Sequence, residues 1–242
     1  MKKIVFLFYV VFLGIQSIYA QIILNNDTIV CSMQAVDLYA LSTEPTSMQA
    51  DDGHDSIREI GFAFNFYGQA YTHLVISGNG YITFDTLVAN TPSPYIIGAA
   101  IPNPGSMPEN AIMAPWHDAS LAIGGNVYFG TTGVAPNRMF FVTWCLVPMY
   151  SCNADLFTSQ VVLHEGSNKI EMFIKEKPLC LAWNGGAAVH GLVDATSTNF
   201  DIVDDPVLLL PRNWPLTWTA TNEGWEFIPN GPTSYTINAV PY

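Results

Sequence analysis

The stretch that decides the fold spans residues 61–84 and reads Gly61-Phe-Ala-Phe-Asn-Phe-Tyr-Gly-Gln-Ala-Tyr-Thr-His-Leu-Val-Ile-Ser-Gly-Asn-Gly-Tyr-Ile-Thr-Phe84. Aromatic and aliphatic residues alternate with small or polar ones, which is typical of strands with one buried face. We predict strands near 61–67, 72–77 and 80–85. The turn Ser77-Gly78-Asn79-Gly80 has the Asn-Gly pair of a two-residue hairpin, which requires positive φ at both central positions.

The remainder of the chain repeats this pattern of short strands and turns. No window shows a sustained helical period, and residues Ala111–Asp118 read as a buried connection. Further strands are predicted at 126–130, 138–145, 157–165, 169–177, 187–193 and 224–228. The expected fold class is therefore all-β, a single large antiparallel β-sandwich with long loops.

The clearest hairpin runs from Phe157 to Lys177 around a turn at Gly166-Ser167-Asn168. Cys152 lies fifteen residues before Ser167 and Cys180 thirteen after it, so an antiparallel ladder brings both to the same end. We therefore predict a Cys152–Cys180 disulfide.

This pairing leaves Cys31 and Cys145 as a second, weaker pair. The rival pairing of Cys145 with Cys152 would close a short loop, and it stays open at this point.

The chain begins with Met1-Lys2-Lys3 and an apolar run from Ile4 to Ile15, followed by a polar patch that ends at Ala20. A basic start, a short apolar core and a small residue before a cut are typical of a secretory signal peptide. We expect residues 1–20 to be the signal, 21–60 to be a lead-in packed on the domain and 61–230 to be the sandwich. Residues 231–242 are expected to begin a linker or a following module.

The formal net charge is −12, from 8 basic and 20 acidic residues. Such a surface is a poor partner for nucleic acid, whose phosphates require clustered Lys and Arg. An anionic membrane is equally unsuitable, and no stretch after the signal is long and apolar enough to span a bilayer. Calcium or a cationic surface is electrostatically permitted.

The candidate calcium ligands are Asp51, Asp52 and Asp55, with Gly53 permitting a sharp bend. The full EF-hand pattern and its closing Glu are absent, so a solvated acidic loop is the competing interpretation. No cofactor other than calcium is expected.

We predict no catalytic residues. His117 and Asp118 are adjacent on an extended segment and point to opposite sides, so they cannot form a dyad. Asp118 is expected to accept hydrogen bonds from backbone donors in the turn before Leu121. Trp214 and Trp218 lie near a loop and are the candidates for stacking against a sugar.

Several motifs carry a resemblance to a known family. They are Gly61-Phe62-x-Phe64-x-Phe66-Tyr67-Gly68, Ile76-Ser77-x-Asn79-Gly80-Tyr81-Ile82-x-Phe84, Ala114-Pro115-Trp116-His117-Asp118 and Trp183-Asn184-Gly185-Gly186. Their order and spacing resemble nidogen-like extracellular domains. They are closer still to the N-terminal β-module of secreted Bacteroidetes proteins found beside gliding-motility-associated, type IX secretion sorting regions. The resemblance implies a framework for an adhesive module, without catalytic residues to carry over.

The expected function is a secreted, non-catalytic adhesion or surface-display module, extracellular or at the cell surface and part of a larger protein. It would bind an extracellular protein or glycan through loops 48–58, 88–110 and 194–213. The alternative is a carbohydrate-binding, lectin-like module or a carbohydrate-active jelly-roll protein. A purely structural spacer is the third hypothesis.

Overall fold

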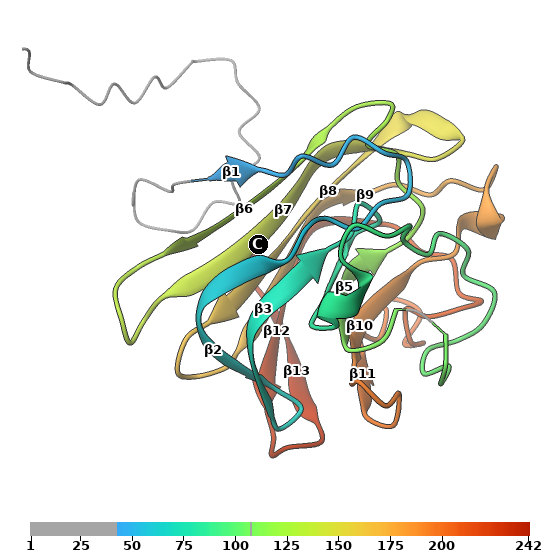
Figure 1. Ribbon diagram of the computed structural model, residues 1–242. Helices are drawn as coiled ribbons and strands as arrows, with labels where there is room; N and C mark the ends of the chain where they lie inside the picture. The colour runs from blue at the N-terminus through green and yellow to red at the C-terminus, as the bar shows by residue number, and fades with distance from the viewer. Residues whose placement is uncertain (1–42, 107) are drawn as a thin grey trace, which may run out of the picture. The chain divides into compact units, whose positions relative to one another are not determined.

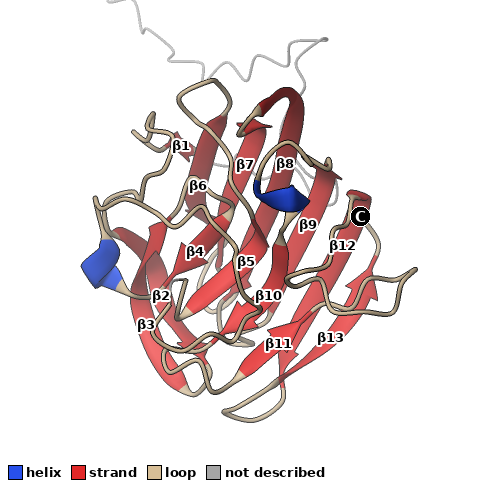
Figure 2. Ribbon diagram, turned by 90° about the vertical axis from the view of Figure 1, so that its right-hand side faces the viewer, coloured by secondary structure: helices blue, strands red, loops and turns tan. Residues whose placement is uncertain are grey.

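The computed structural model describes residues 43–106 and 108–242, which fold as two antiparallel sheets with one aromatic-rich core between them (Figures 1 and 2). The larger sheet has the strand order β1 (Glu44–Pro45), β6 (Asn126–Thr132), β7 (Met139–Met149), β8 (Cys152–His164), β9 (Ile170–Lys177), β12 (Ala220–Pro229), β13 (Tyr235–Val240). The smaller sheet has the order β11 (Phe200–Ile202), β10 (Val189–Val193), β5 (Ala111–Trp116), β4 (Tyr81–Thr83), β3 (Gln69–Ile76), β2 (Arg58–Phe66). The predicted all-β sandwich is confirmed.

Strand β2 shows why the quoted stretch determines the fold. Ile60, Phe62, Phe64 and Phe66 are buried, and the residues between them are exposed. This period of two lets one face of the strand enter the core while the other meets solvent. The ring of Phe84 packs against Phe66 at a centroid distance of 4.9 Å, so the aromatic residues of the stretch fill the same interior.

The turn between β3 and β4 differs from the two-residue hairpin that we predicted. Ser77 N donates to Tyr81 O, and only Gly80 among the turn residues has positive φ, at 82°. Three residues, 78–80, therefore lie between the hydrogen-bonded Ser77 and Tyr81. A Cβ at Gly80 would lie 2.1 Å from Pro115 O, so this glycine allows the turn to approach β5.

Residues 111–116, predicted as a buried connection, instead form the fully buried strand β5. A proline such as Pro115 is unusual in a central strand because it has no N–H to donate. Pro115 is accommodated because it is not paired in either ladder. Residues 111–113 are the ones that pair without interruption with both β4 and β10.

The predicted β8–β9 hairpin is confirmed, with Leu163 opposite Ile170. Cys152 and Cys180 form a disulfide with a Cα separation of 5.8 Å, as the hairpin predicts. The rival Cys145–Cys152 pairing is therefore wrong. Cys31 lies outside the described residues, and the Cys31–Cys145 pair stays a prediction.

The sandwich extends beyond the boundary expected at residue 230. Residues 235–240, expected to begin a linker or a following module, form edge strand β13 and pair with β12. Tyr235 is buried against Phe66 and Tyr67. At the other end, Glu44–Pro45 pairs with β6. The sequence also favours a strand near residues 29–39, and this stretch, like the expected signal peptide, lies outside the described residues.

Candidate functional site: three linked loops and an apolar tip

The three loops that we predicted to bind a partner are 48–58, 88–110 and 194–213. Backbone hydrogen bonds connect the first loop to the second, and His54 N donates to Thr91 O at 2.9 Å. The His54 side chain is also buried between these loops, with its Nδ1 3.2 Å from Thr91 Oγ1. The two loops are therefore held side by side.

The second loop is bonded in turn to the third. Asn213 Nδ2 donates to Ile101 O at 2.6 Å, and Asn213 Oδ1 accepts from Ile101 N at 3.0 Å. Asn110 N donates to Asp194 O at 3.0 Å. The loops thus form one linked set carried by the sandwich.

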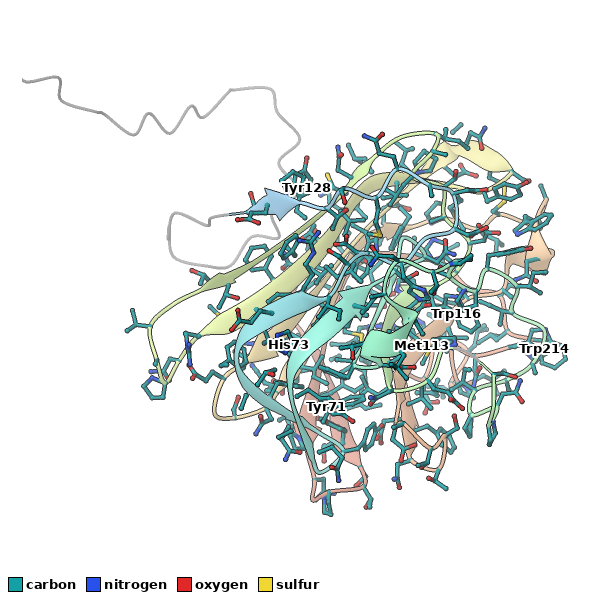
Figure 3. The ribbon with its side chains drawn as sticks, viewed as in Figure 1. Tyr71, His73, Met113, Trp116, Tyr128 and Trp214 are labelled. Atoms are coloured by element: carbon teal, nitrogen blue, oxygen red, sulfur yellow. A yellow bond between two sulfur atoms is a disulfide. The ribbon has the colours of Figure 1, made fainter. Side chains whose placement is uncertain are left out.

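The third loop carries an exposed apolar tip, which we define as residues 207–210. The exposed fractions are 84% for Val207, 53% for Leu208, 76% for Leu209 and 52% for Leu210. Trp214, four residues further along, is 42% exposed and lies at the margin of the fold (Figure 3). Contiguous exposed apolar groups of this kind mark interaction sites in soluble proteins.

The apolar tip is held at its base by three charged residues, Asp205, Arg212 and Glu223, which we call the charged frame. The carboxylate of Asp205 accepts hydrogen bonds from Val207 N at 3.0 Å, Leu208 N at 2.9 Å and Arg212 Nε at 3.2 Å. Arg212 is buried and also forms a bidentate pair with Glu223 of β12, at 2.6 and 2.9 Å. Bidentate charge-assisted pairs fix geometry, so the tip is presented in a defined conformation.

Trp218 does not join Trp214 at the surface, which corrects the predicted pair of sugar-stacking rings. Trp218 is buried, its Nε1 donates to Ala188 O at 3.1 Å, and the Arg212 guanidinium lies 4.3 Å from its ring centroid. Its neighbour Lys177 donates from Nζ to Trp218 O at 2.7 Å. Trp218 therefore anchors the loop, and only Trp214 of the two is available to a ligand.

Burial has a strong effect on the basic groups beneath the apolar tip. It lowers the pKa of Lys177 to about 7, and the nearby positive charge of Arg212 lowers it further. The pKa of His190 lies well below its ordinary value for the same two reasons. These shifts belong to a buried cluster of basic side chains.

The acidic loop does not bring its three predicted calcium ligands together. Asp55 is buried and pairs with Arg58 through Nε at 2.7 Å and Nη2 at 3.0 Å. Asp52 instead accepts from Asn79 Nδ2 at 2.9 Å through its Oδ1. Asp55 is therefore neutralised by arginine, and only Asp51 and Asp52 remain from the predicted set.

Asp118 lies beside this remaining pair. The Asn79 side chain that holds Asp52 also accepts from Ala119 N at 3.0 Å. We expected Asp118 to accept backbone hydrogen bonds, but no backbone donor reaches its buried Oδ1. Burial raises the pKa of Asp118 to about 7, the charge of Asp52 raises it further, the side chain of Trp183 lowers it as a hydrogen-bond donor, and the charge of Asp51 raises it.

A cavity of about 10 Å³ adjoins Asp118, with His117, Tyr150, Trp183 and Asn184 among its lining residues. It has room for about one water-sized body. No group of three or more His, Cys, Asp and Glu side chains is arranged to hold a metal ion within residues 43–106 and 108–242.

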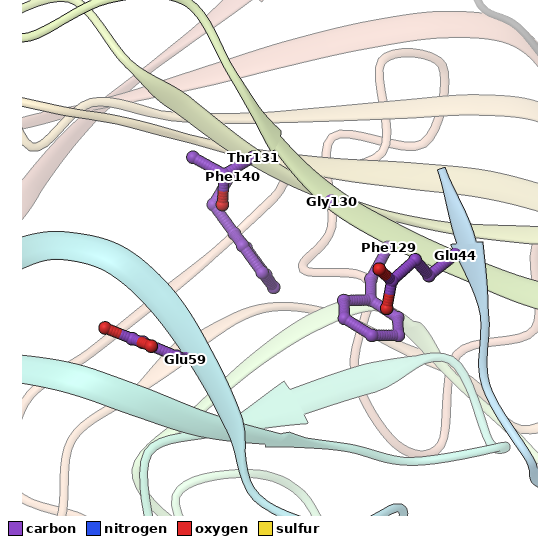
Figure 4. A pocket seen from close by; sticks show the side chains of 6 residues that line it. All are labelled: Glu44, Glu59, Phe129, Gly130, Thr131 and Phe140. Atoms are coloured by element: carbon purple, nitrogen blue, oxygen red, sulfur yellow. The ribbon is translucent and has the colours of Figure 1, made fainter. Parts of the chain in front are cut away.

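A second hollow opens between β2 and β6 and has a volume of about 160 Å³ (Figure 4). Glu59 and Glu44 border it from β2 and β1, and the rings of Phe129 and Phe140 line it. Small-molecule sites commonly measure roughly 300–1,000 Å³. This hollow is smaller, and the guanidinium of Arg58 lies 4.5 Å from the Phe129 ring centroid.

These features define a β-sandwich module whose third loop carries an exposed apolar tip. The chain matches the NIDO-related family over residues 32–223 and therefore belongs to that family. Searches of curated proteins and of solved structures found no match. Family membership and the Cys152–Cys180 disulfide are consistent with an extracellular domain.

Across the part of the chain that the structure describes, no helix is long and apolar enough to cross a membrane.

Proposed function

We propose that this protein is a secreted, non-catalytic adhesion or surface-display module that binds an extracellular partner through its loops. The proposal extends to the setting that the sequence suggests, a surface protein of the Bacteroidetes type. The extracellular, non-catalytic character of the module is supported by membership of the NIDO-related family and by the disulfide of the β8–β9 hairpin.

The observation that carries the proposal is the apolar tip on its charged frame. Four consecutive aliphatic side chains are more than half exposed, while Asp205 and Arg212 beneath them are buried and bonded to each other. A flexible apolar loop would lose conformational entropy on binding, whereas a loop already held by hydrogen bonds loses less. The arrangement therefore suits a contact surface for an apolar patch on a protein.

The overall charge narrows the class of partner. With a formal net charge of −12, the chain is repelled by nucleic acid and by anionic lipid at long range. We therefore propose a neutral or basic extracellular protein whose apolar patch receives the tip.

The proposal is tested by binding to an array of immobilised extracellular proteins and glycans. Val207→Ser removes an apolar side chain from the tip, and we expect its affinity for the protein ligands to fall about tenfold. The matched control is Val134→Ser in the β6–β7 turn, because Val134 is 80% exposed but lies outside the three loops. A blank array, or equal losses in the two variants, would refute the proposal.

The glycan half of the same array tests the lectin alternative. Trp214 is the exposed member of the predicted stacking pair. Asp205 is a nearby carboxylate, but it already forms an ion pair with Arg212. Glycan binding that Trp214→Ala abolishes and Val207→Ser leaves intact would favour the lectin alternative over the proposed protein contact.

A further inference from the structure

Strand β13 forms one edge of the larger sheet, with β12 on its inner side (Figure 2). Its first residue, Tyr235, donates from N to Asp201 Oδ2 at 3.1 Å, so this N–H points away from β12. Because alternate residues of an antiparallel strand direct their N–H and C=O groups to opposite sides, Ile237 and Ala239 point outward in the same way. Among the described residues, none bonds to the outward backbone groups of Ile237 and Ala239. The edge therefore offers unpaired backbone groups to another strand.

The other edge strands are either capped or very short. On the free side of β2, Thr131 Oγ1 donates to Ile60 O at 2.8 Å. Asn168 Oδ1 accepts from Asn65 N of the same strand, also at 2.8 Å. The edge strands β1 and β11 have only two and three residues. Strand β13 has six residues and none of the prolines or charged side chains that usually protect an exposed edge.

The sequence around this edge indicates which strand it can accept. No Asp, Glu, Lys or Arg occurs from residue 227 to residue 242, although the chain carries a formal net charge of −12. A charged partner strand would find no opposite charge to pair with there, whereas a second copy of β13 places no like charges opposite each other. The edge is therefore complementary to an uncharged strand of its own composition.

We propose that two copies of this chain associate edge to edge through antiparallel pairing of their β13 strands. A twofold axis relates the two copies, so the same residues contribute from each side. Since Tyr235 N is already bonded to Asp201, the register that uses only free groups pairs Ile237 of one copy with Ala239 of the other. Each such pair exchanges two hydrogen bonds, and Asn238 lies opposite its counterpart at the axis.

The side chains suit this register as well. Tyr235 and Ile237 pack on the core, and Ala239 lies on the same face of the strand because side chains alternate. Thr236 and Asn238 are exposed on the opposite face. The pairing therefore places apolar side chains beside apolar ones and polar beside polar, and it extends the larger sheet across both copies. The edge is separate from the apolar tip, so this proposal and the proposed function can fail independently.

Cysteine cross-linking tests the pairing and its register. Asn238→Cys places a thiol at the axis, where the two Cα atoms would lie about 4.5 Å apart, within the range of a disulfide. Thr236→Cys is the matched control, because Thr236 is also exposed but would lie roughly 13 Å from its counterpart. Under mild oxidation we expect Asn238→Cys to form a covalent dimer on a non-reducing gel and Thr236→Cys to remain a monomer. Equal yields of dimer from the two variants would overturn the register.

Sedimentation equilibrium measures the association itself. We expect the mass of the wild-type protein to rise toward twice that of the monomer as its concentration increases. Ala239→Pro removes an outward N–H without breaking a bond to β12, so we expect this variant to stay monomeric. Ala239→Val is the control, because it keeps the N–H and should associate as the wild-type protein does.

A wild-type protein that remains monomeric at every concentration would overturn the proposal and leave the edge to a strand of another protein. Undiminished association of Ala239→Pro would also overturn it. Urea unfolding shows whether Ala239→Pro is folded. If it is not, the cross-linking pair decides, because both of its substitutions are at exposed positions.

Discussion

At the scale of single residues, Lys177 shows how the core tolerates charge. Its ammonium group has one hydrogen-bond acceptor, Trp218 O, and lies 4.7 Å from the centroid of the Trp218 ring. Arg212 is close enough to disfavour a second positive charge. The side chain therefore gives up its proton more readily in the folded protein than in the unfolded chain.

This difference predicts a dependence of stability on pH. Because the pKa of Lys177 falls from 10.5 in the unfolded chain to about 7 in the folded protein, the unfolded state binds more protons between these values. The free energy of unfolding contributed by Lys177 therefore rises as the pH increases from 7 toward 10. Below pH 7 both states are protonated, and the full cost of burying the charge is present.

Lys177→Met removes this dependence, and urea unfolding at pH 7, 8.5 and 9.5 measures it. We expect the stability of the wild-type protein to rise over this range relative to that of the variant. Lys175→Met is the control, because Lys175 is an exposed neighbour on β9. Parallel curves for the wild-type protein and Lys177→Met would show that Lys177 stays charged.

At the scale of elements, the packing of the β3–β4 turn against β5 depends on one glycine. Gly80 has a φ of 82°, and an added Cβ would lie 2.1 Å from Pro115 O. Both the backbone conformation and the close approach exclude a side chain.

Gly80→Ala should therefore lower the free energy of unfolding by about 3 kcal/mol, as measured by urea denaturation. Gly98→Ala in the second loop is the matched control, because nothing lies within 4 Å of its Cβ position. We expect Gly98→Ala to change stability by less than about 0.5 kcal/mol. Equal effects of the two substitutions would contradict the close packing of the turn on β5.

Elements that pair with a neighbouring segment through a short turn could be predicted from the sequence. Elements that depend on contacts with distant segments could not. The β8–β9 hairpin has an alternating pattern and a short turn, so the hairpin and the Cys152–Cys180 disulfide could be predicted directly. Strand β5 was missed because Pro115 is unusual in a central strand, and its place depends on the ends of two ladders.

The candidate sites illustrate the same limit. The run Val207–Leu210 is apolar in the sequence, but how it is presented depends on the bonds among Asp205, Arg212 and Glu223. The link between the first loop and the segment after β5 depends on Asn79, which bonds to Asp52, Ser93 and Ala119 in three separate segments. No local pattern encodes such contacts.

At the scale of the whole domain, the sandwich and the loops have different roles. The two sheets bury the aromatic and aliphatic residues, and the proposed recognition surface lies in the connections between strands. The second loop is bonded to both the first and the third, which makes the loops a single supported surface. We therefore expect the strands to change little when a partner binds.

Hydrogen–deuterium exchange of the wild-type protein, free and bound to the strongest protein ligand from the array, tests the central claim most directly. We predict that the ligand slows exchange mainly in residues 203–214, with smaller effects in the two loops bonded to this segment. Protection concentrated instead on the strand edges or around the Glu44–Glu59 hollow, with residues 203–214 unchanged, would contradict recognition through the apolar tip.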